Sequence, residues 1–169
     1  MKSFGAGCIA VSSLAFGLMA LRERRQRICC LRALGAALAL LASELEQCRT
    51  PLPRLASELA ARTEYPASDF FHALAGGLTR LGELSFFEVW STALADTLPE
   101  LSAYERESLL EAGHYLGRFS ANEQIRAVER SAALLSDALR REETAFRDGK
   151  KLCLALPAVA GALLVILLV

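Results

Sequence analysis

Residues 31–48 read LRALGAALALLASELEQC, and the spacing of apolar residues in this stretch decides the fold. The apolar positions recur at intervals of 3, 4, 3, 4 and 3 residues: Leu31, Leu34, Leu38, Leu41, Leu45 and Cys48. This is the spacing of a coiled-coil seam, because it keeps every apolar side chain on one face of a helix. The stretch therefore predicts a long helix with one buried stripe.

A second seam lies near the other end of the sequence. Its apolar positions are Ile125, Val128, Ala132, Leu135, Leu139 and, after a break at Glu142, Phe146. We expect the two seams to pair antiparallel, since each long helix continues into an apolar end of the chain and pairing would bury both stripes. The alternative, in which each seam packs only on the helices between them, stays open.

Helix-boundary residues divide the sequence between the seams into four shorter helices. Thr50 with Pro51 predicts one helix start, Tyr65-Pro66 an end, and Ser68 the next start. Three capping-box pairs predict further starts: Ser85 with Glu88, Ser102 with Glu105, and Ser120 with Glu123. No alternating strand pattern competes. The prediction is an all-α bundle of about six helices, the first and last of them long.

Both ends of the chain are apolar enough to cross a membrane. Residues 4–21 and 152–169 each contain eighteen residues without a charged side chain. Each would form a helix about 27 Å long, close to the ~30 Å hydrocarbon core. We therefore predict a transmembrane helix within 1–21, a helical domain over 22–151 and a transmembrane helix over 152–169. The alternative for the first segment is a cleaved signal peptide.

Basic residues flank the inner side of both apolar segments and form a predicted membrane neck: Arg22, Arg24, Arg25, Arg27, Arg147, Lys150 and Lys151. Only Lys2 lies beyond them. By the positive-inside rule, the central domain is expected in the cytosol, with both termini on the far side of the membrane.

The central domain is acidic although the whole chain has a formal charge of zero. Residues 33–139 hold eight basic and fifteen acidic side chains. A chain without net charge is not expected to bind nucleic acid, whereas an acidic domain suits a partner with a positive face. The alternative is an ordinary solvated surface.

Two carboxylate–histidine pairs raise the alternative of a di-iron enzyme. Asp69 with His72, and Glu111 with His114, have the three-residue spacing that such helical bundles use. A di-iron site also needs inward carboxylates from two other helices. The candidates, Glu44, Glu46 and Glu129, fall on the polar faces of the seams, so we expect no metal.

Other catalytic motifs are missing from the sequence. Gly76-Gly77 is not followed by the lysine and threonine of a P-loop, and there is no G-x-S-x-G serine. We therefore expect neither an enzyme nor a cofactor or small-molecule site, and any energy used must come from a partner. Gly113 and Gly117 have small-xxx-small spacing, which indicates an oligomer contact or, alternatively, tight packing at a helix end.

The order and spacing of several short motifs resemble the stage III sporulation protein AB family of endospore-forming bacteria. These motifs are LRAL (31–34), LASELE (41–46), TPLP (50–53), LA (59–60), FEVW (87–90), AL (93–94), ESLL (107–110), Gly113, LG (116–117) and EQ (123–124). The resemblance covers nearly the whole chain, including both apolar ends.

The resemblance implies a structural protein of the mother-cell membrane around the forespore, part of a multiprotein channel between the two cells. It also implies a cytosolic domain like the platform domain of type II secretion and type IV pilus systems, which works with a cytosolic ATPase. Our hypothesis is that the domain docks a secretion-type ATPase beside other membrane proteins of the channel. Its candidate contacts are Thr50, Pro51, Pro53, Glu58, Glu83, Glu88, Glu100 and Glu107. A platform protein outside sporulation is the alternative.

Overall fold

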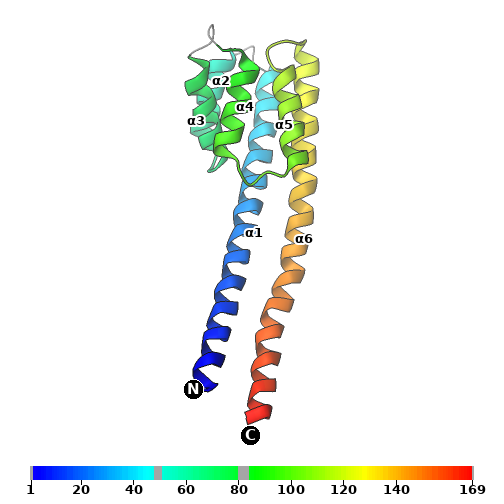
Figure 1. Cartoon of the computed structure of the whole chain (residues 1–169). Coiled ribbons are helices and arrows are strands. Elements are labelled where there is room, and N and C mark those ends of the chain that lie inside the picture. Colours follow the sequence, from blue (N-terminus) through cyan, green and yellow to red (C-terminus); the bar gives the residue numbers. More distant parts are fainter. Residues whose placement is uncertain (1, 48–50, 80–83, 169) are drawn as a thin grey trace. The chain divides into compact units, whose positions relative to one another are not determined.

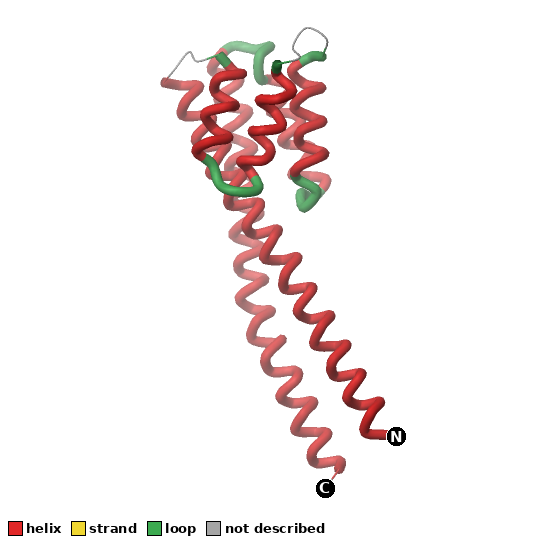
Figure 2. Tube along the Cα trace, turned by 90° about the vertical axis from the view of Figure 1, so that its left-hand side faces the viewer, coloured by secondary structure: helices red, strands yellow, loops and turns green. Residues whose placement is uncertain are grey.

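Six helices account for the secondary structure of the chain in a computed structural model that describes residues 2–47, 51–79 and 84–168 (Figure 1). They are α1 (Lys2–Gln47), α2 (Leu52–Arg62), α3 (Ala67–Leu78), α4 (Phe86–Thr97), α5 (Ala103–Tyr115) and α6 (Ala121–Leu168). The described ranges contain no strand element (Figure 2). The prediction of an all-α protein with long first and last helices is confirmed.

The chain divides into two units that share the two long helices. The head comprises residues 27–139, and the terminal unit comprises residues 1–26 together with 140–169. Side chains are described for residues 19, 21–47, 51–79, 84–147 and 149, so the head is described almost completely.

Local capping fixes the starts of α4 and α5 as the sequence predicts. The Ser85 hydroxyl accepts a hydrogen bond from the Glu88 N–H, and the Glu88 carboxylate accepts one from the Ser85 N–H. Ser102 and Glu105 repeat this arrangement at α5. These reciprocal bonds satisfy backbone donors that a helix start leaves without partners.

The third predicted box, at α6, forms only in one direction. The Glu123 carboxylate accepts from the Ser120 N–H at 3.0 Å and from its hydroxyl at 2.6 Å. The Glu123 N–H, however, donates to the Ser120 carbonyl at 3.0 Å rather than to the hydroxyl. A turn at Ser120 thus replaces half of the box.

Two helix starts differ slightly from the prediction. The N-cap of α2 is Pro51, and Thr50 lies outside the described residues. α3 begins at Ala67 after Pro66, one residue before the predicted start, and Ser68 makes no cap. Instead its hydroxyl contacts the Asp69 carboxylate at 3.4 Å. Backbone carbonyls accept from N–H groups at this helix start instead: the Ser68 N–H donates to the Glu64 carbonyl at 3.0 Å, and the Phe70 N–H donates to the Pro66 carbonyl at 3.3 Å.

The head core forms around the first seam. Leu31, Leu34, Leu38 and Leu41 of α1 are all buried, as the spacing predicts. Around them α2, α3, α4 and α5 pack as sequential neighbours, joined by short connections and running in alternating directions (Figure 1). Short connections favour such antiparallel neighbours. The buried apolar surface of these five helices and of α6 forms one cluster.

Trp90 of α4 ties α3 and α5 into this core. Its ring meets Phe70 edge-on at 4.9 Å, and its Nε1–H donates to the Leu109 carbonyl at 2.8 Å. Gly113 makes room for it, because a Cβ at that position would lie 2.3 Å from Trp90 Cδ1. Gly117 follows the end of α5 with φ +80°, a backbone conformation that favours glycine. Gly113 thus serves packing and Gly117 a helix end. This agrees with the alternative interpretation of their spacing, tight packing at a helix end.

Within the head, α1 and α6 approach each other at a glycine. A Cβ built on Gly35 would lie 3.8 Å from the Leu135 Cβ, an ordinary van der Waals contact. Val128 and Leu135 of the second seam are buried, whereas Ile125 and Leu139 are only half-buried. The second seam therefore uses part of its predicted stripe in the head core.

The predicted membrane spans, 4–21 and 152–169, have helical backbone up to Leu168, but their side chains lie outside the described residues. Within the part of the chain whose side chains are described, one helical stretch meets the length and hydropathy of a membrane span, Leu21–Gln47, with a mean hydropathy of 1.8. Because its leucines form the centre of the head core, we assign most of this stretch to the core.

Candidate partner-binding surfaces

A groove runs between α5 and α6 because small side chains form its floor. Ser108 and Ala112 of α5 face Ala127 and Ser131 of α6, and the groove has a volume of about 400 Å³. The two serine hydroxyls lie 3.0 Å apart, and the Ser131 hydroxyl donates to the Ser108 carbonyl at 3.0 Å. These bonds satisfy the buried polar groups of the floor.

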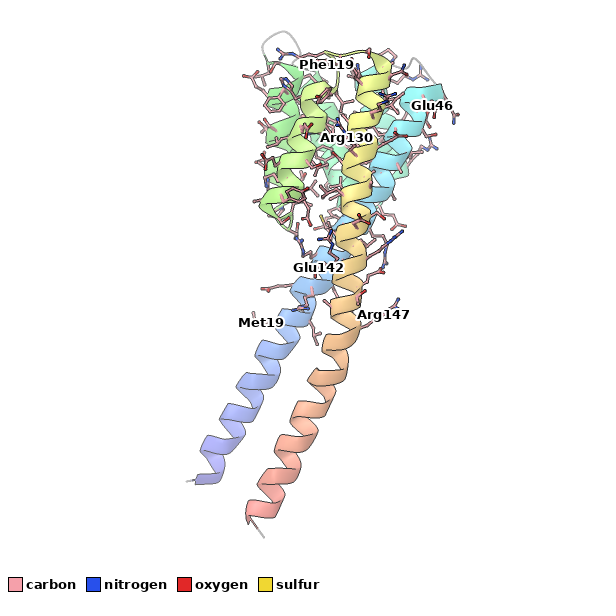
Figure 3. All side chains as sticks on the ribbon, turned by 90° about the vertical axis from the view of Figure 1, so that its right-hand side faces the viewer. Met19, Glu46, Phe119, Arg130, Glu142 and Arg147 are labelled. Atoms are coloured by element: carbon pink, nitrogen blue, oxygen red, sulfur yellow. The ribbon has the colours of Figure 1, made fainter. Side chains whose placement is uncertain are left out.

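The walls of this groove carry an aromatic ring and charges. Tyr104 and Glu107 stand exposed on α5, and Tyr104 is 71% exposed. Glu111, one turn further, lies 3.9 Å from the Arg130 guanidinium of α6. Figure 3 shows Arg130 midway along the head portion of α6. The spacing 104, 107 and 111 places the three α5 side chains on one helix face.

A second hollow, of about 410 Å³, continues the groove beyond Arg130 and is lined by Tyr115, Glu123, Arg126, Glu129 and Arg130. The Arg130 guanidinium lies over the Tyr115 ring, 5.8 Å from its centroid. Hydrogen bonds from Ser120 lower the pKa of the Glu123 carboxyl, so this wall keeps its negative charge in mild acid.

Aromatic rings surround His114 at the end of α5. Phe87 and Phe119 lie 5.8 Å and 6.1 Å from its ring, and Phe119 is 41% exposed. Figure 3 shows Phe119 and Glu46 at the same end of the head. His114 thus packs against rings, while its predicted partner Glu111 faces Arg130.

The residues considered for a di-iron site are dispersed. Asp69 and His72 are exposed on α3, and Glu44 accepts a hydrogen bond from Arg62 at 2.7 Å. Among the residues with described side chains, no group of three His, Cys, Asp or Glu could hold a metal ion. The spacing of the pairs therefore does not bring a ligand set together in this part of the chain.

A buried polar cluster lies where α1 enters the head. Arg27 donates to the Glu105 carboxylate at 2.8 Å and to the Glu100 carbonyl at 2.7 Å. Glu105 is only 3% exposed, and its other oxygen caps α5. Burial, together with the negative charges of Glu100 and Glu105, raises the pKa of the neighbouring Cys30 thiol to about 12. This cluster fixes the first turn of α5 to α1.

The predicted partner contacts are spread over several elements. Pro51 and Pro53 are exposed at the start of α2, and the Glu58 carboxylate is bound by Arg54 at 3.0 Å. Glu88 is exposed but caps α4, and Glu100 is half-buried in the connection before α5. Thr50 and Glu83 lie outside the described residues.

Of these predicted contacts, Glu107 is the one that lines the α5–α6 groove. Tyr104 and Arg130 line the same groove and were not predicted as contacts. Positions 104, 107 and 111 are three and four residues apart, so their side chains share one helix face. This spacing is the signal in the sequence that could have identified Tyr104 as a neighbour of Glu107.

The predicted membrane neck is partly described. Arg22, Arg24, Arg25 and Arg147 are exposed in the terminal unit, where the Arg25 guanidinium lies 5.9 Å from the centroid of the Phe146 ring. Figure 3 shows Arg147 on α6, just beyond Glu142. Arg27, by contrast, is half-buried in the head, and the side chains of Lys150 and Lys151 lie outside the described residues.

The fold and these surfaces define an all-α protein in which a helical head shares its first and last helices with apolar chain ends. The chain belongs to the stage III sporulation protein AB family, whose model matches residues 2–169. A solved structure of stage III sporulation protein AB (SpoIIIAB) is similar, with a TM-score of 0.52 and 24% sequence identity over 74% of this chain and 94% of that chain. At this identity the likeness shows the fold. The comparison with curated proteins gave no match.

Proposed function

We propose that the chain is a non-catalytic membrane component of the channel complex between mother cell and forespore, and that its head docks a secretion-type ATPase. The observation that carries this proposal is the family match over residues 2–169, which includes both apolar ends as well as the head. A family defined over the whole chain supports a role in which anchors and head act together.

In this proposal, residues 4–21 and 152–169 cross the membrane and the head lies in the cytosol. Four exposed arginines beside these segments, Arg22, Arg24, Arg25 and Arg147, support that orientation. Basic side chains next to a span favour the cytosolic side and interact with anionic headgroups. Arg27 contributes to the structure of the head instead.

We further propose that the seams of α1 and α6 pack against each other in antiparallel orientation. The close approach of the two helices at Gly35 and Leu135 supports pairing in the head, and the position of the Arg25 guanidinium over the Phe146 ring supports it in the terminal unit. Paired long helices are stiffer than single ones, because each restricts the bending of the other. Such a pair would transmit a position or a movement between an ATPase and the membrane.

The ATPase partner is supported by charge and by the sequence. The head segment 33–139 has a net charge of minus seven, from eight basic and fifteen acidic side chains. An acidic surface favours encounter with a basic one. The sequence itself has no P-loop, so a nucleotide-driven movement would need a partner.

Co-purification from membranes tests this function. The tagged full chain, extracted in mild detergent from sporulating cells, should retain the secretion-type ATPase, whereas an unrelated tagged two-pass protein should not. Recovery of the chain in the soluble fraction would contradict the anchoring. Failure of the ATPase to co-purify, even after chemical crosslinking, would contradict the docking.

A further inference from the structure

The α5–α6 groove has the form of a binding site for one helix of a partner. Its floor of serine and alanine side chains lies below walls of longer side chains, as described above. A helix that lies in a groove places one row of side chains against the floor and flanks it with others. The hollow of about 400 Å³ at the Tyr104 end is large enough for several such side chains.

Charge is distributed unevenly along this groove. In the half nearer Tyr115, Arg126 and Arg130 stand among Glu123 and Glu129, so acidic and basic groups balance. In the half nearer Tyr104, the two carboxylates of Glu107 and Glu111 face one guanidinium, that of Arg130, which lies 3.9 Å from Glu111. The Tyr104 half is therefore negative, with an exposed ring beside its carboxylates.

A carboxylate beside an exposed aromatic ring favours a cationic side chain. A lysine or arginine could pair with Glu107 and lie over the face of Tyr104, which attracts cations. Serine and alanine on the floor leave room for small or apolar neighbours on the same helix.

We propose that the α5–α6 groove binds a basic amphipathic helix of the secretion-type ATPase, with a lysine or arginine of that helix placed between Tyr104 and Glu107. This inference rests on the proposed function and specifies the surface that performs it. It assigns docking to the groove rather than to the dispersed positions on α2 and α4.

The test compares variants of the exposed walls, which leave the head core intact. Full-length chain in detergent is titrated with the purified secretion-type ATPase. The variants are Glu107→Lys, Tyr104→Ala and, as a matched control, Glu64→Lys. Glu64 is an exposed glutamate in the connection between α2 and α3 and is not among the residues that line the groove. Thermal melts confirm that all three variants fold as the wild type does.

The groove predicts a loss of affinity of about tenfold or more for Glu107→Lys, because charge reversal replaces attraction by repulsion. It predicts a smaller loss for Tyr104→Ala and no change for Glu64→Lys. A photo-crosslinker at position 104 should label the ATPase, and one at position 64 should not.

Three results would overturn the groove assignment. Equal affinity of all variants would place docking elsewhere while leaving the proposed function intact. A change in self-association without a change in ATPase affinity would show that a second copy of the chain occupies the groove. No binding of ATPase by the wild-type chain would contradict both the groove and the proposed function.

Discussion

Arg27 on α1 and Glu105 on α5 form an ion pair of 2.8 Å between residues 78 positions apart in the sequence. The Glu105 side chain is 4% exposed and that of Arg27 is 25% exposed. Glu105 also completes the capping box of α5. One carboxylate thus joins the start of α5 to the first helix where that helix enters the head.

Replacing this carboxylate should destabilise the head. Glu105→Gln keeps the size of the side chain but removes the buried negative charge beside Arg27, so we expect a loss of about 2–3 kcal/mol in the free energy of unfolding. Urea unfolding of the full chain in detergent, followed by Trp90 fluorescence, measures it. Because Trp90 is the only tryptophan of the sequence, the fluorescence reports the head.

The matched control is Glu58→Gln, which removes an exposed pair with Arg54. The side chains of this pair are 76% and 41% exposed, so the expected cost is below about 0.5 kcal/mol. Equal costs for the two variants would show that the buried pair has no special role.

Alanine should have opposite effects at two glycines. In Gly113→Ala, the new methyl group meets the buried Trp90 ring, so we expect destabilisation of about 1–3 kcal/mol. Gly76 lies inside α3, where a Cβ would have no described side chain within 4 Å, so Gly76→Ala should stabilise by roughly 0.5–1 kcal/mol. Thermal melts of both variants check the pair, and the same sign of change in both would be inconsistent with the packing around Trp90.

Acid should weaken the caps of α4 and α6. Hydrogen bonds from Ser85 and Ser120 lower the pKa of the Glu88 and Glu123 carboxyls below the ordinary value of 4.5. A lowered pKa in the folded state means that these groups add stability above their unfolded pKa, and that this stability is lost as pH falls through the folded pKa.

The matched measurement is a series of thermal melts from pH 7 to pH 3. The double variant Glu88→Gln, Glu123→Gln should be less stable than wild type at pH 7, and the difference should shrink as pH falls below about 4.5. A difference that stays constant over this range would contradict the proposed protonation of the caps.

Neighbouring cysteines should differ in reactivity. Cys29 is exposed, whereas Cys30 is buried and its thiol has a pKa of about 12. In full chains that keep one of these cysteines and have serine at the other four, maleimide at pH 8 should label Cys29 quickly and Cys30 only after denaturation. Fast labelling of Cys30 in the native protein would mean that α1 does not enter the core at this residue.

The sequence predicts most of the helical architecture because its determinants are local. The seam leucines of α1, the boxes at Ser85 and Ser102, and the break at Tyr65-Pro66 each depend on residues within a few positions of one another. The predicted start of α3 is one residue too late. Both Pro66 and Ser68 are possible boundary residues, and the helix begins directly after Pro66.

Interactions between distant segments could not be predicted from the sequence. Neither the Arg27–Glu105 pair nor the bond from Trp90 to the Leu109 carbonyl follows from periodicity, because both depend on how helices pack. For the same reason Arg27 was grouped with the neck arginines. The α5–α6 groove was not predicted, although one of its wall residues, Glu107, is a predicted contact, because the floor of the groove depends on which small residues of α5 and α6 meet.

The central claim is that two apolar chain ends hold a helical head in the cytosol. Thiol labelling tests it most directly, in intact vegetative cells that express the chain in their surface membrane, with a membrane-impermeant maleimide and cysteine-free full-length chains that carry a single new cysteine. We predict that Ser3→Cys is labelled from outside, and that Glu64→Cys, in the head, is labelled only after the membrane is opened. Labelling of Glu64→Cys in intact cells, with protection of Ser3→Cys, would place the head on the opposite side and contradict the account.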